Sequence, residues 1–306
     1  MVIQTKQYQS TDYLVDTDWL ELHLEDTNLR IYDCSVSVQE NPDTELSKKF
    51  PFIYKNGSTQ YKQGHIPRAG FIDIPGVLSD LASDLPLMLP PEKQFIETMS
   101  NYGVGDNTRV VLYSTTEPNW SARVWWMLRS FGFDNAVILN GGWEKWKKEG
   151  RATSNQPCEY LPGQFTSCHR PDLFVEKDQV LNAIEDEGAC IVNALPFFLH
   201  TGASDIAFGR KGKIVSSVNV AFTSLHDPIT GCYLSSEKLQ KIFDDVGADN
   251  AKQIINYCGG GIASSNTAFA LTLLGYNNVS VYDGSLLEWG NDTSLPMEMD
   301  MTVANQ

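Results

Sequence analysis

The sequence predicts an α/β protein built from two tandem domains, each a mostly parallel sheet with helices on both faces. The chain of 306 residues is long enough for two domains of about 150 residues each. Short apolar, strand-like runs alternate with helix-like runs in both halves, which is typical of parallel sheets. The order of these runs in the first half recurs in the second half, which indicates an internal duplication.

The first matched elements lie near the start of each half. A stretch that begins at Val15 reaches the apolar run around Asp33 after 18 positions, and a stretch that begins at Val175 reaches Asn193 after the same 18 positions. Each stretch has an acidic first turn, an amphipathic segment and then an apolar run. We therefore expect a short helix followed by a buried strand in both places.

The next match pairs residues 64–67 with residues 212–215. A short apolar run follows each segment, so strands are expected at 71–74 and 218–220.

The strongest match covers the last third of each half. Apolar runs at 109–114 and 253–258 predict buried strands, and each is followed by a loop, a helix-like run and a glycine turn. A final apolar run and a second glycine turn follow, at 137–143 and 279–286. Trp146 and Trp289 close the two copies, each 14 positions after the first of these glycine turns. Chance similarity does not account for several segments matched in the same order.

These matches set the domain boundaries. We expect an N-terminal domain at 1–150, a linker at 151–164 that is rich in Thr, Ser, Asn, Pro and Gly, and a C-terminal domain at 165–306.

Composition and charge exclude several classes of function. The chain is 42% hydrophobic and carries a formal charge of −15, so it has enough apolar material for two cores and is not a disordered chain. Nucleic acid and anionic membranes need a cationic face, and we expect neither as a partner. The first ten residues do not resemble a secretory signal, and no apolar stretch is long enough to span a membrane. A cytoplasmic protein is expected, and a small anionic substrate stays possible.

Six cysteines are few for a chain of this length, and none forms a Cys-x-x-Cys pair. This pattern argues against zinc sites and disulfide frameworks, and most of the thiols are expected to be buried and inert. The cysteines are Cys34, Cys158, Cys168, Cys190, Cys232 and Cys258.

Cys258 has a different setting from the other five. It stands at the end of a predicted strand, before Gly259, Gly260 and Gly261, and a good helix former follows at 266–274. Consecutive glycines allow backbone N–H groups to turn inward, and a helix start adds unpaired N–H donors and positive partial charge. A thiol in that cradle is favoured as a thiolate, and the same donors would stabilise a persulfide anion.

Other interpretations of this loop are weaker. Cys258 as a packed thiol beside a tight glycine turn is an alternative that the loop alone does not exclude. A phosphate-binding loop lacks its Gly-Lys-Ser/Thr, and contiguous glycines do not fit a dinucleotide fingerprint. A Cys-based phosphatase needs Arg six residues after its Cys, where this chain has Ser264.

Segments spread over both halves resemble those of one known family. They are Gly64-His65-Ile66-Pro67-Arg68-Ala69, Met88-Leu89-Pro90, Asn140-Gly141-Gly142-Trp143, Tyr257-Cys258-Gly259-Gly260-Gly261-Ile262-Ala263, Val281-Tyr282-Asp283-Gly284-Ser285 and Glu288-Trp289. With the tandem repeat, they resemble the rhodanese family of thiosulfate and 3-mercaptopyruvate sulfurtransferases from about Tyr13 to Met297. The resemblance implies two rhodanese-like domains, of which one is catalytic.

The resemblance assigns roles to the two copies. Cys258 would accept a sulfane sulfur from thiosulfate or 3-mercaptopyruvate and pass it to cyanide or a thiol, with no cofactor and no metal. Backbone N–H groups from Gly259 through Gly260, Gly261, Ile262 and Ala263 to Ser264 would hold the charge. A thioredoxin-like reductant is a further expected partner. Ser114 occupies the Cys258 position in the first copy and has no flanking base, so the N-terminal domain is expected to be a non-catalytic wall of the cleft.

Departures from the family pattern leave the donor undetermined. Gly259 and Gly260 stand where thiosulfate-type loops carry basic residues, and Gly260 also replaces a serine of mercaptopyruvate-type loops. Leu195 replaces an arginine that binds the anionic donor in many second domains, and Leu286 replaces a frequent tryptophan.

Four residues are candidates to bind the substrate instead. Arg210 and Lys211 are the nearest cations in the sequence, with a solvated surface pair as the alternative. Arg68, which replaces a family glycine, and His65 are also candidates, although His65 also fits a structural role. The missing arginine motivates a second hypothesis, a non-catalytic sulfur-carrier or interaction module that a partner protein loads.

Overall fold

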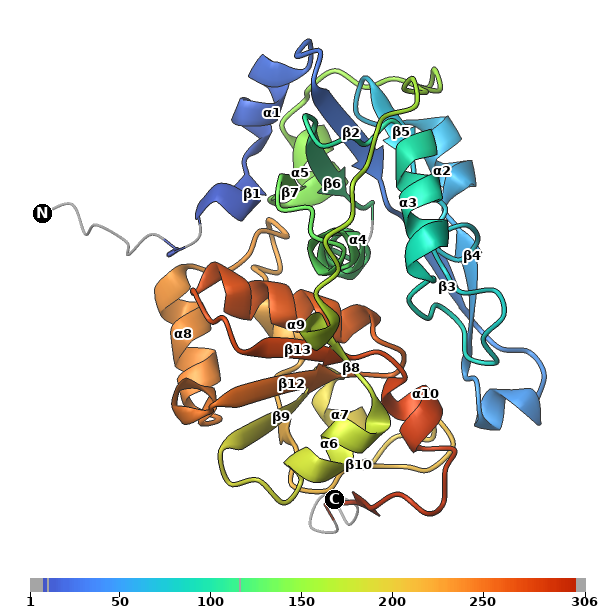
Figure 1. Ribbon diagram of the computed structural model, residues 1–306, viewed down its shortest axis with the longest axis vertical. Helices are drawn as coiled ribbons and strands as arrows, with labels where there is room; N and C mark the ends of the chain where they lie inside the picture. Colours follow the sequence, from blue (N-terminus) through green and yellow to red (C-terminus); the bar gives the residue numbers. More distant parts are fainter. Residues whose placement is uncertain (1–7, 10, 116, 301–306) are drawn as a thin grey trace, which may run out of the picture.

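Two five-stranded parallel sheets form the body of the protein (Figure 1). The computed structural model describes residues 8–9, 11–115 and 117–300. In spatial order, the first sheet contains β1 (Leu14–Val15), β7 (Ala136–Leu139), β6 (Arg109–Tyr113), β2 (Leu29–Asp33) and β5 (Ala69–Phe71). The second contains β8 (Phe174–Val175), β13 (Val279–Tyr282), β12 (Gln253–Tyr257), β9 (Ala189–Asn193) and β11 (Val218–Asn219).

The two sheets have the same strand order, and every strand pair in them is parallel. Each strand of the first five-stranded sheet therefore has a counterpart at the same place in the second. This confirms the predicted α/β duplication, since chance similarity of two halves would not reproduce a whole sheet topology.

Helices connect the strands in both halves. The first half contains η1 (Thr11–Tyr13), α1 (Thr17–His23), η2 (Leu46–Lys48), α2 (Ser58–Gln63), α3 (Glu92–Asn101), α4 (Asn119–Ser130) and α5 (Gly142–Lys148). The second half contains η3 (Pro171–Leu173), α6 (Lys177–Ala183), α7 (Phe197–His200), η4 (Phe222–Leu225), α8 (Ser236–Asp244), η5 (Ala248–Asn250), α9 (Ile262–Leu273) and α10 (Ser285–Trp289). No helix in these described ranges is long and apolar enough to cross a membrane.

The structure shifts two of the expected elements. The strand expected at 71–74 lies at Ala69–Phe71, because Asp73 accepts a hydrogen bond from the N–H of Gly76 and starts a turn there. The helix expected at 266–274 begins four residues earlier, at Ile262, because Gly261 caps it in the left-handed conformation (φ 77°).

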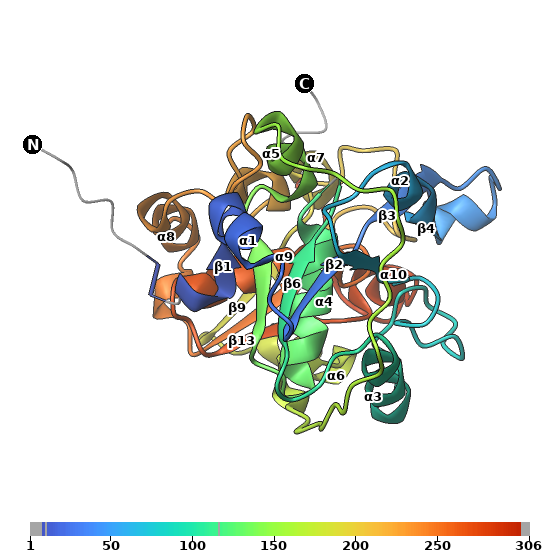
Figure 2. The same cartoon turned by 90° about the horizontal axis from the view of Figure 1, so that it is seen from above.

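An antiparallel hairpin interrupts the repeat in the first half. Its strands, β3 (Val36–Glu40) and β4 (Phe52–Asn56), stand out on one side of the molecule in both ribbon views (Figures 1 and 2). The hairpin reaches the second half, where the N–H of Gly209 donates to the carbonyl of Lys48 (2.8 Å). A second small antiparallel pair, β10 (Lys213–Ile214) with β14 (Met297–Glu298), lies near the end of the described chain.

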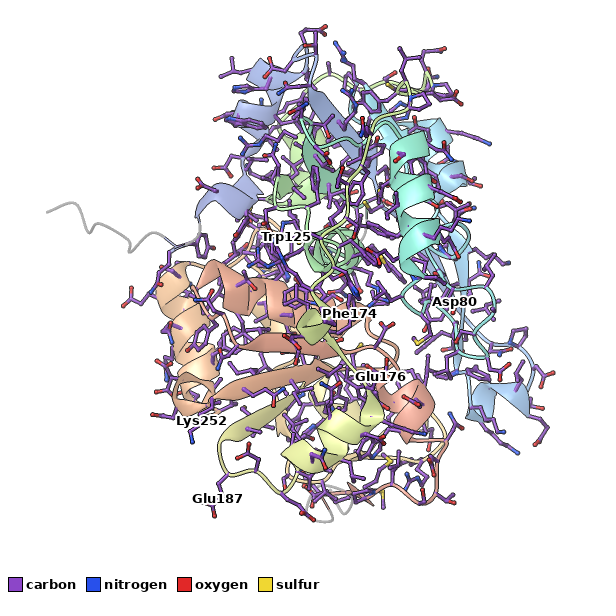
Figure 3. The ribbon with its side chains drawn as sticks, in the orientation of Figure 1. Asp80, Trp125, Phe174, Glu176, Glu187 and Lys252 are labelled. Atoms are coloured by element: carbon purple, nitrogen blue, oxygen red, sulfur yellow. The ribbon has the colours of Figure 1, made fainter. Side chains whose placement is uncertain are left out.

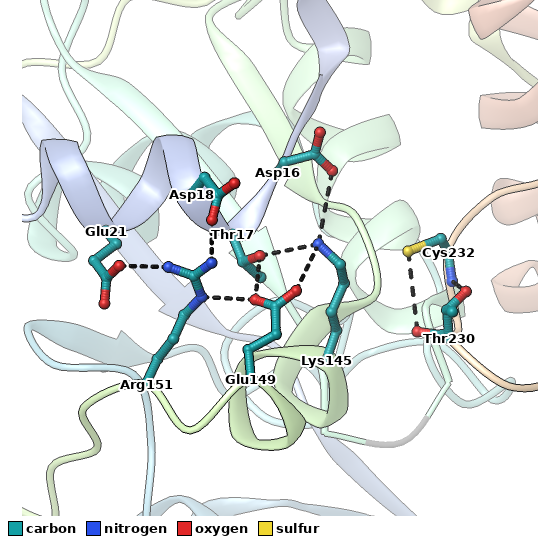
Figure 4. Close-up of polar contacts among 9 residues, drawn as sticks. All are labelled: Asp16, Thr17, Asp18, Glu21, Lys145, Glu149, Arg151, Thr230 and Cys232. Carbon is teal, nitrogen blue, oxygen red and sulfur yellow. Dashed lines mark hydrogen bonds and ion pairs between the residues drawn. The ribbon is translucent and has the colours of Figure 1, made fainter. Parts of the chain in front are cut away.

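The segment predicted as a linker is attached to the first half along its length. Arg151 forms ion pairs with Asp18, Glu21 and Glu149 (Figure 4). Burial opposes ionisation of Glu149, but hydrogen bonds from Thr17, Arg151 and Lys145 outweigh it and lower its pKa to about 2. Further on, the hydroxyl of Tyr160 accepts a hydrogen bond from the N–H of Ile31 on β2 and donates one to the carbonyl of Arg68, just before β5. The linker is therefore a strap on the N-terminal domain and not a free tether.

The two halves meet where α4 packs against α9. The Trp125 ring lies between them and contacts Phe269 edge to face (4.8 Å between centroids; Figure 3). Beside these rings, the Asn266 side chain bonds to Asn119 of the other half and to His226 (2.9 Å each). This buried polar contact, together with the apolar core that spans both halves, joins the domains in one body.

We expect His226 to make the interface sensitive to acid. Burial lowers its pKa to about 4 from an ordinary 6.5. Between pH 6.5 and pH 4, the unfolded state therefore binds more protons at this histidine than the folded state. The free energy of unfolding falls as the pH falls through this window, and His226 alone lowers it by about 2 kcal/mol at pH 5 relative to neutral pH. Urea unfolding at pH 7.5 and pH 5 should show that His226→Gln loses correspondingly less stability than the wild type.

His169→Gln, at an exposed histidine, controls for the loss of an imidazole. The same pH slope in His226→Gln and in the wild type would contradict the prediction. His200, also buried and with its pKa lowered to about 4, adds a similar contribution in both proteins and so cancels in the comparison.

Candidate active site

Cys258 directly follows β12, the central strand of the second sheet, which pairs with β9 on one side and β13 on the other. The side chain is 2% exposed. In open parallel sheets, ligands bind beyond the carboxyl ends of the strands, and Cys258 stands at that edge.

The three glycines after Cys258 are required by close packing. A Cβ atom on Gly259 would lie 2.5 Å from the ring of Phe208, and one on Gly260 would lie 2.7 Å from Leu287. Gly261 has a left-handed φ of 77°, and its Cβ would meet the Asp283 carboxylate at 2.7 Å. The loop is therefore pressed between side chains of its own domain, and a larger residue at any of the three positions would displace one of them.

Ser285 clamps both ends of this loop. Its hydroxyl oxygen accepts hydrogen bonds from the N–H of Cys258 (3.1 Å) and of Gly261 (3.2 Å), and it donates to the carbonyl of Tyr282 (2.7 Å). Ser285 has a left-handed φ of 47°, which is unfavourable for a residue with a side chain. In the sequence, Ser285 stands out only as part of a family motif, and its contact with Cys258 spans 27 residues, so no local pattern reveals this role.

The remaining N–H groups of the loop face no competing acceptor. Within the described residues, the backbone N–H groups of Gly259 and Gly260 have no hydrogen-bond acceptor. The first N–H groups of α9, from Ile262 onward, lack partners inside the helix and carry its positive dipole end. The loop therefore offers a set of donors next to a thiol, which is the arrangement expected from the sequence.

A hydroxyl group also reaches the sulfur. Ser264, in the first turn of α9, donates to Sγ of Cys258 (3.5 Å). Only the backbone of Ser264 was expected to take part, and Gly260 stands where mercaptopyruvate-type loops carry a serine hydroxyl. The turn of the helix supplies one from a different position, since residue 264 faces back toward the strand end.

A buried ion pair supports the loop from the N-terminal domain. Arg123 on α4 is fully buried and pairs with Asp283 (2.6 Å), and it also lies 3.5 Å from the carbonyl of Gly261. Its second nitrogen donates to the carbonyl of Leu87 (2.8 Å), while the Asp283 carboxylate accepts from the N–H of Leu89 (2.7 Å). These contacts tie loop 258–261 to the first half, and the repeat pattern did not reveal them.

The hairpin provides a wall beside the thiol. Tyr54 on β4 is largely buried, and burial, followed by the charge of Cys258, raises the pKa of its phenol. Phe52 on the same strand contacts Phe208 (6.1 Å between centroids), and Phe208 in turn covers Gly259. The hairpin of the first half thus packs against the apolar cluster that contains Cys258.

The structure contradicts a substrate-binding role for Arg210. Its guanidinium donates to the backbone carbonyls of Gly290, Leu295, Trp289 and Asp292, which uses its donors inside the protein. Lys211 is exposed and pairs with Asp205 (3.1 Å) at a groove that also contains Phe52 and Gly209.

His65 and Arg68 are not brought to the Cys258 loop. His65 is buried, and both ring nitrogens contact carbonyls, those of Tyr61 (2.7 Å) and Gln156 (3.0 Å). Arg68 pairs with Glu25 at the surface of the N-terminal domain. Both side chains are engaged within the N-terminal domain, where the segment 64–69 packs against the strap.

The corresponding loop of the first half has no thiol and a different geometry. The hydroxyl of Ser114 donates to the carbonyl of Glu117 (2.6 Å), so it stabilises a turn. At the other predicted departures, Leu195 and Leu286 are both buried in the apolar cluster that contains Cys258. Neither supplies charge to the site.

The fold and the loop together define a sulfurtransferase with two rhodanese-type domains. The rhodanese-like domain model matches residues 16–149 and 177–292. The crystal structure of SseA from Escherichia coli, a 3-mercaptopyruvate enzyme, superposes with a TM-score of 0.77 at 32% identity, covering 90% of this chain and 99% of that one. The chain belongs to the tandem rhodanese sulfurtransferase family, and it is a sulfurtransferase.

Two curated relatives differ in the function that their names state. The thiosulfate/3-mercaptopyruvate sulfurtransferase 1 of Arabidopsis thaliana is 30% identical over 317 residues, covering 96% of this chain and 80% of the relative. The sulfur carrier protein TtuD of Thermus thermophilus is 28% identical over 312 residues, covering 95% of this chain and 98% of the relative.

Removing the Ser285 hydroxyl should disorder the donors around Cys258. In Ser285→Ala, two buried N–H groups lose their acceptor, which costs about 1–3 kcal/mol of unfolding free energy. We expect sulfur transfer to fall at least about tenfold, by analogy with the removal of other oriented donors. Urea unfolding and a cyanide-coupled thiocyanate assay measure the two effects.

The substitution Ser285→Gly separates the effect of the strained backbone from the effect of the hydroxyl. Glycine relieves the left-handed strain, but like alanine it lacks the hydroxyl. We expect it to be as inactive as Ser285→Ala. Ser280→Ala, at a buried serine of β13 whose hydroxyl contacts the Ile254 carbonyl, is the matched control. Full activity in both Ser285 variants would contradict the clamp.

Proposed function

We propose that this protein transfers a sulfane sulfur through a persulfide on Cys258. The observation that carries the proposal is the position of Cys258 between the end of β12 and the start of α9, in a glycine loop with unpaired N–H donors. These donors favour an anionic sulfur, and nucleophilic attack requires the thiolate.

In the first half-reaction, the Cys258 thiolate attacks the outer sulfur of the donor. With thiosulfate, the S–S bond of the donor breaks and sulfite leaves; with 3-mercaptopyruvate, the C–S bond breaks and pyruvate leaves. The new Cys258 persulfide carries a negative charge one atom further out. The N–H groups of Gly259, Gly260 and the first turn of α9, with the Ser264 hydroxyl, lie where they can stabilise it.

In the second half-reaction, cyanide or a thiolate attacks the outer sulfur, and Cys258 leaves as the thiolate. In this step the N–H donors of the loop stabilise the negative charge on the inner sulfur. The same donors therefore serve both half-reactions of a ping-pong cycle. A thioredoxin-like dithiol is a plausible protein acceptor in chemical terms, and we propose a cytoplasmic location in keeping with a reactive free thiol.

The donor must bind without the arginine that many family members use. We propose that the loop N–H groups hold its charge, and that Lys211 adds a cation at the entrance next to Phe52 and Gly209. Lys211→Ala should then raise the KM for thiosulfate about threefold with little change in kcat, as expected for an exposed charge. Lys241→Ala, at an exposed lysine on α8, is the control; equal KM values in wild type and both variants would contradict this role.

A second function is favoured by the uncharged site. Leu195, Gly259 and Gly260 are uncharged at positions where related proteins carry cations. A relative of similar length is named a sulfur carrier. In this alternative, a partner protein loads Cys258 directly, and free small donors react poorly.

The central test is the substitution Cys258→Ser. We expect it to abolish thiocyanate formation from every donor, because a hydroxyl does not form a persulfide. The thermal unfolding midpoint should stay close to the wild type, since the change is small. Activity that survives in Cys258→Ser would contradict the proposal, and Cys232→Ser, at a partly buried cysteine outside the loop, is the matched control.

Intact-protein mass spectrometry separates the two functions. Incubation of the wild type with thiosulfate or 3-mercaptopyruvate should add one sulfur, and cyanide should remove it. Loading without any partner supports the enzyme, whereas loading only in the presence of a cysteine desulfurase supports the carrier.

A further inference from the structure

We propose that a groove between the β3–β4 hairpin and residues 75–87 binds the acceptor, and that the acceptor is a small thiol with an apolar body and no negative charge. This inference rests on the proposed persulfide function. The groove, called the hairpin groove below, has a volume of about 450 Å³. Its apolar lining includes Leu46, Phe50, Tyr54, Leu81, Leu85 and Leu87.

The hairpin groove shares residues with the apolar surroundings of Cys258. Tyr54 lines the groove, and the charge of Cys258 acts on its phenol. Phe50, Phe52 and Leu85 pack against the apolar cluster that contains Cys258. These shared residues link the groove to the surroundings of the sulfur that its occupant would receive.

A second contact connects the groove to the loop through Arg123. Leu87 lines the groove, and its carbonyl accepts from Arg123, which lies against the carbonyl of Gly261. The wall of the groove and the loop are therefore held in one fixed arrangement. A bound thiol would meet a preorganised site.

The charges around the groove disfavour an anion. Its charged lining residues are Asp80 and Asp84, and the described lining contains no lysine, arginine or histidine. Asp80 lies on the loop that faces the hairpin (Figure 3). Lys48 and Lys211 line a different groove, on the other side of Phe52, where they pair with Glu45 and Asp205. A carboxylate in the hairpin groove would lose hydration and gain only repulsion.

Size and exposed apolar surface favour an apolar body. Cyanide and thiosulfate fill a small part of 450 Å³, whereas pockets of this volume hold organic ligands. Leu81 is 74% exposed and Leu46 is 48% exposed, although both line the groove. Apolar surface grouped at a concave site next to a reactive group is typical of ligand binding.

The transfer step balances without a further reactant. The thiolate of the acceptor attacks the outer sulfur of the Cys258 persulfide, and a new S–S bond forms in an organic persulfide. The Cys258–sulfur bond breaks, and Cys258 leaves as the thiolate. No net oxidation or reduction occurs beyond the sulfane transfer itself.

Two thiols with the same body test the charge requirement. Protein that carries a persulfide after reaction with thiosulfate or 3-mercaptopyruvate is mixed with benzyl mercaptan or with 4-(mercaptomethyl)benzoate. Samples are quenched at successive times, and mass spectrometry measures the loss of the persulfide. We expect the second-order rate constant to be at least tenfold higher for benzyl mercaptan. Equal rate constants for the two thiols would overturn the proposal.

Substitutions in the groove test the place of binding. In Phe50→Ala and in Leu81→Ser, the ratio of the benzyl mercaptan rate to the cyanide rate should fall about tenfold. In Asp84→Lys, the preference for benzyl mercaptan over the benzoate should shrink or reverse. Leu22→Ser, at an 82% exposed leucine on α1, is the control and should keep both ratios. Unchanged ratios in all three groove variants would overturn the proposal.

The loading step separates the two levels of inference. Absence of loading from any donor contradicts the proposed function and this inference together. Normal loading with equal use of both thiols contradicts this inference alone.

Discussion

The shape of the site depends on one constraint: the chain must turn from β12 into α9 with no Cβ between Cys258 and Ile262. Phe208, Leu287 and Asp283 fill the space where side chains of the three glycines would lie. Ser285 then holds the two ends of the turn through a single oxygen, in a backbone conformation that a serine adopts only at a cost. That cost is offset by the packing of α10, whose N–H groups at Leu286 and Leu287 bind the carbonyls of Cys258 and Gly259. The thiol is placed by this turn and not by its own contacts.

The two copies of the repeat have diverged into complementary parts. The second copy keeps the thiol and the glycine turn. The first copy ends its equivalent strand with Ser114, whose hydroxyl is used in a local turn, and contributes Arg123 and the hairpin to the other copy's site. In the ion pair of Arg123 with Asp283, the arginine is fully buried and the aspartate side chain is 15% exposed, so the pair adds geometric precision but no net charge to the cleft. The two copies of the repeat thus form one site, to which the second copy contributes the thiol and the first copy contributes Arg123 and the hairpin.

The chain carries a charge of −15, and the cations considered for the site in its described part are engaged with other protein groups. Arg123 pairs with Asp283, the Arg210 guanidinium is enclosed by backbone carbonyls, and Lys211 pairs with the exposed Asp205 at a groove beside Phe52. The positive potential at Cys258 therefore comes from peptide N–H groups, which act only over a few ångströms. Charge on a sulfur bound to Cys258 is stabilised, whereas charge on the distant part of a substrate is not. The apolar hairpin groove beside the loop is consistent with this distribution.

The sequence by itself determined the duplication, the parallel α/β class and the position of Cys258 before a glycine loop, because these follow from local patterns and their order. Apolar periodicity is set by burial, and a strand, a nucleophile and glycines in succession are adjacent in the chain. Tertiary structure alone decided which charged groups reach the site. Arg210 and Lys211 are neighbours in sequence, yet one is enclosed by carbonyls and the other is exposed, while His65 and Arg68 lie against their own domain. Ser285, Arg123 and Tyr54 act through contacts between segments that are far apart in the chain, and no local pattern encodes such a contact.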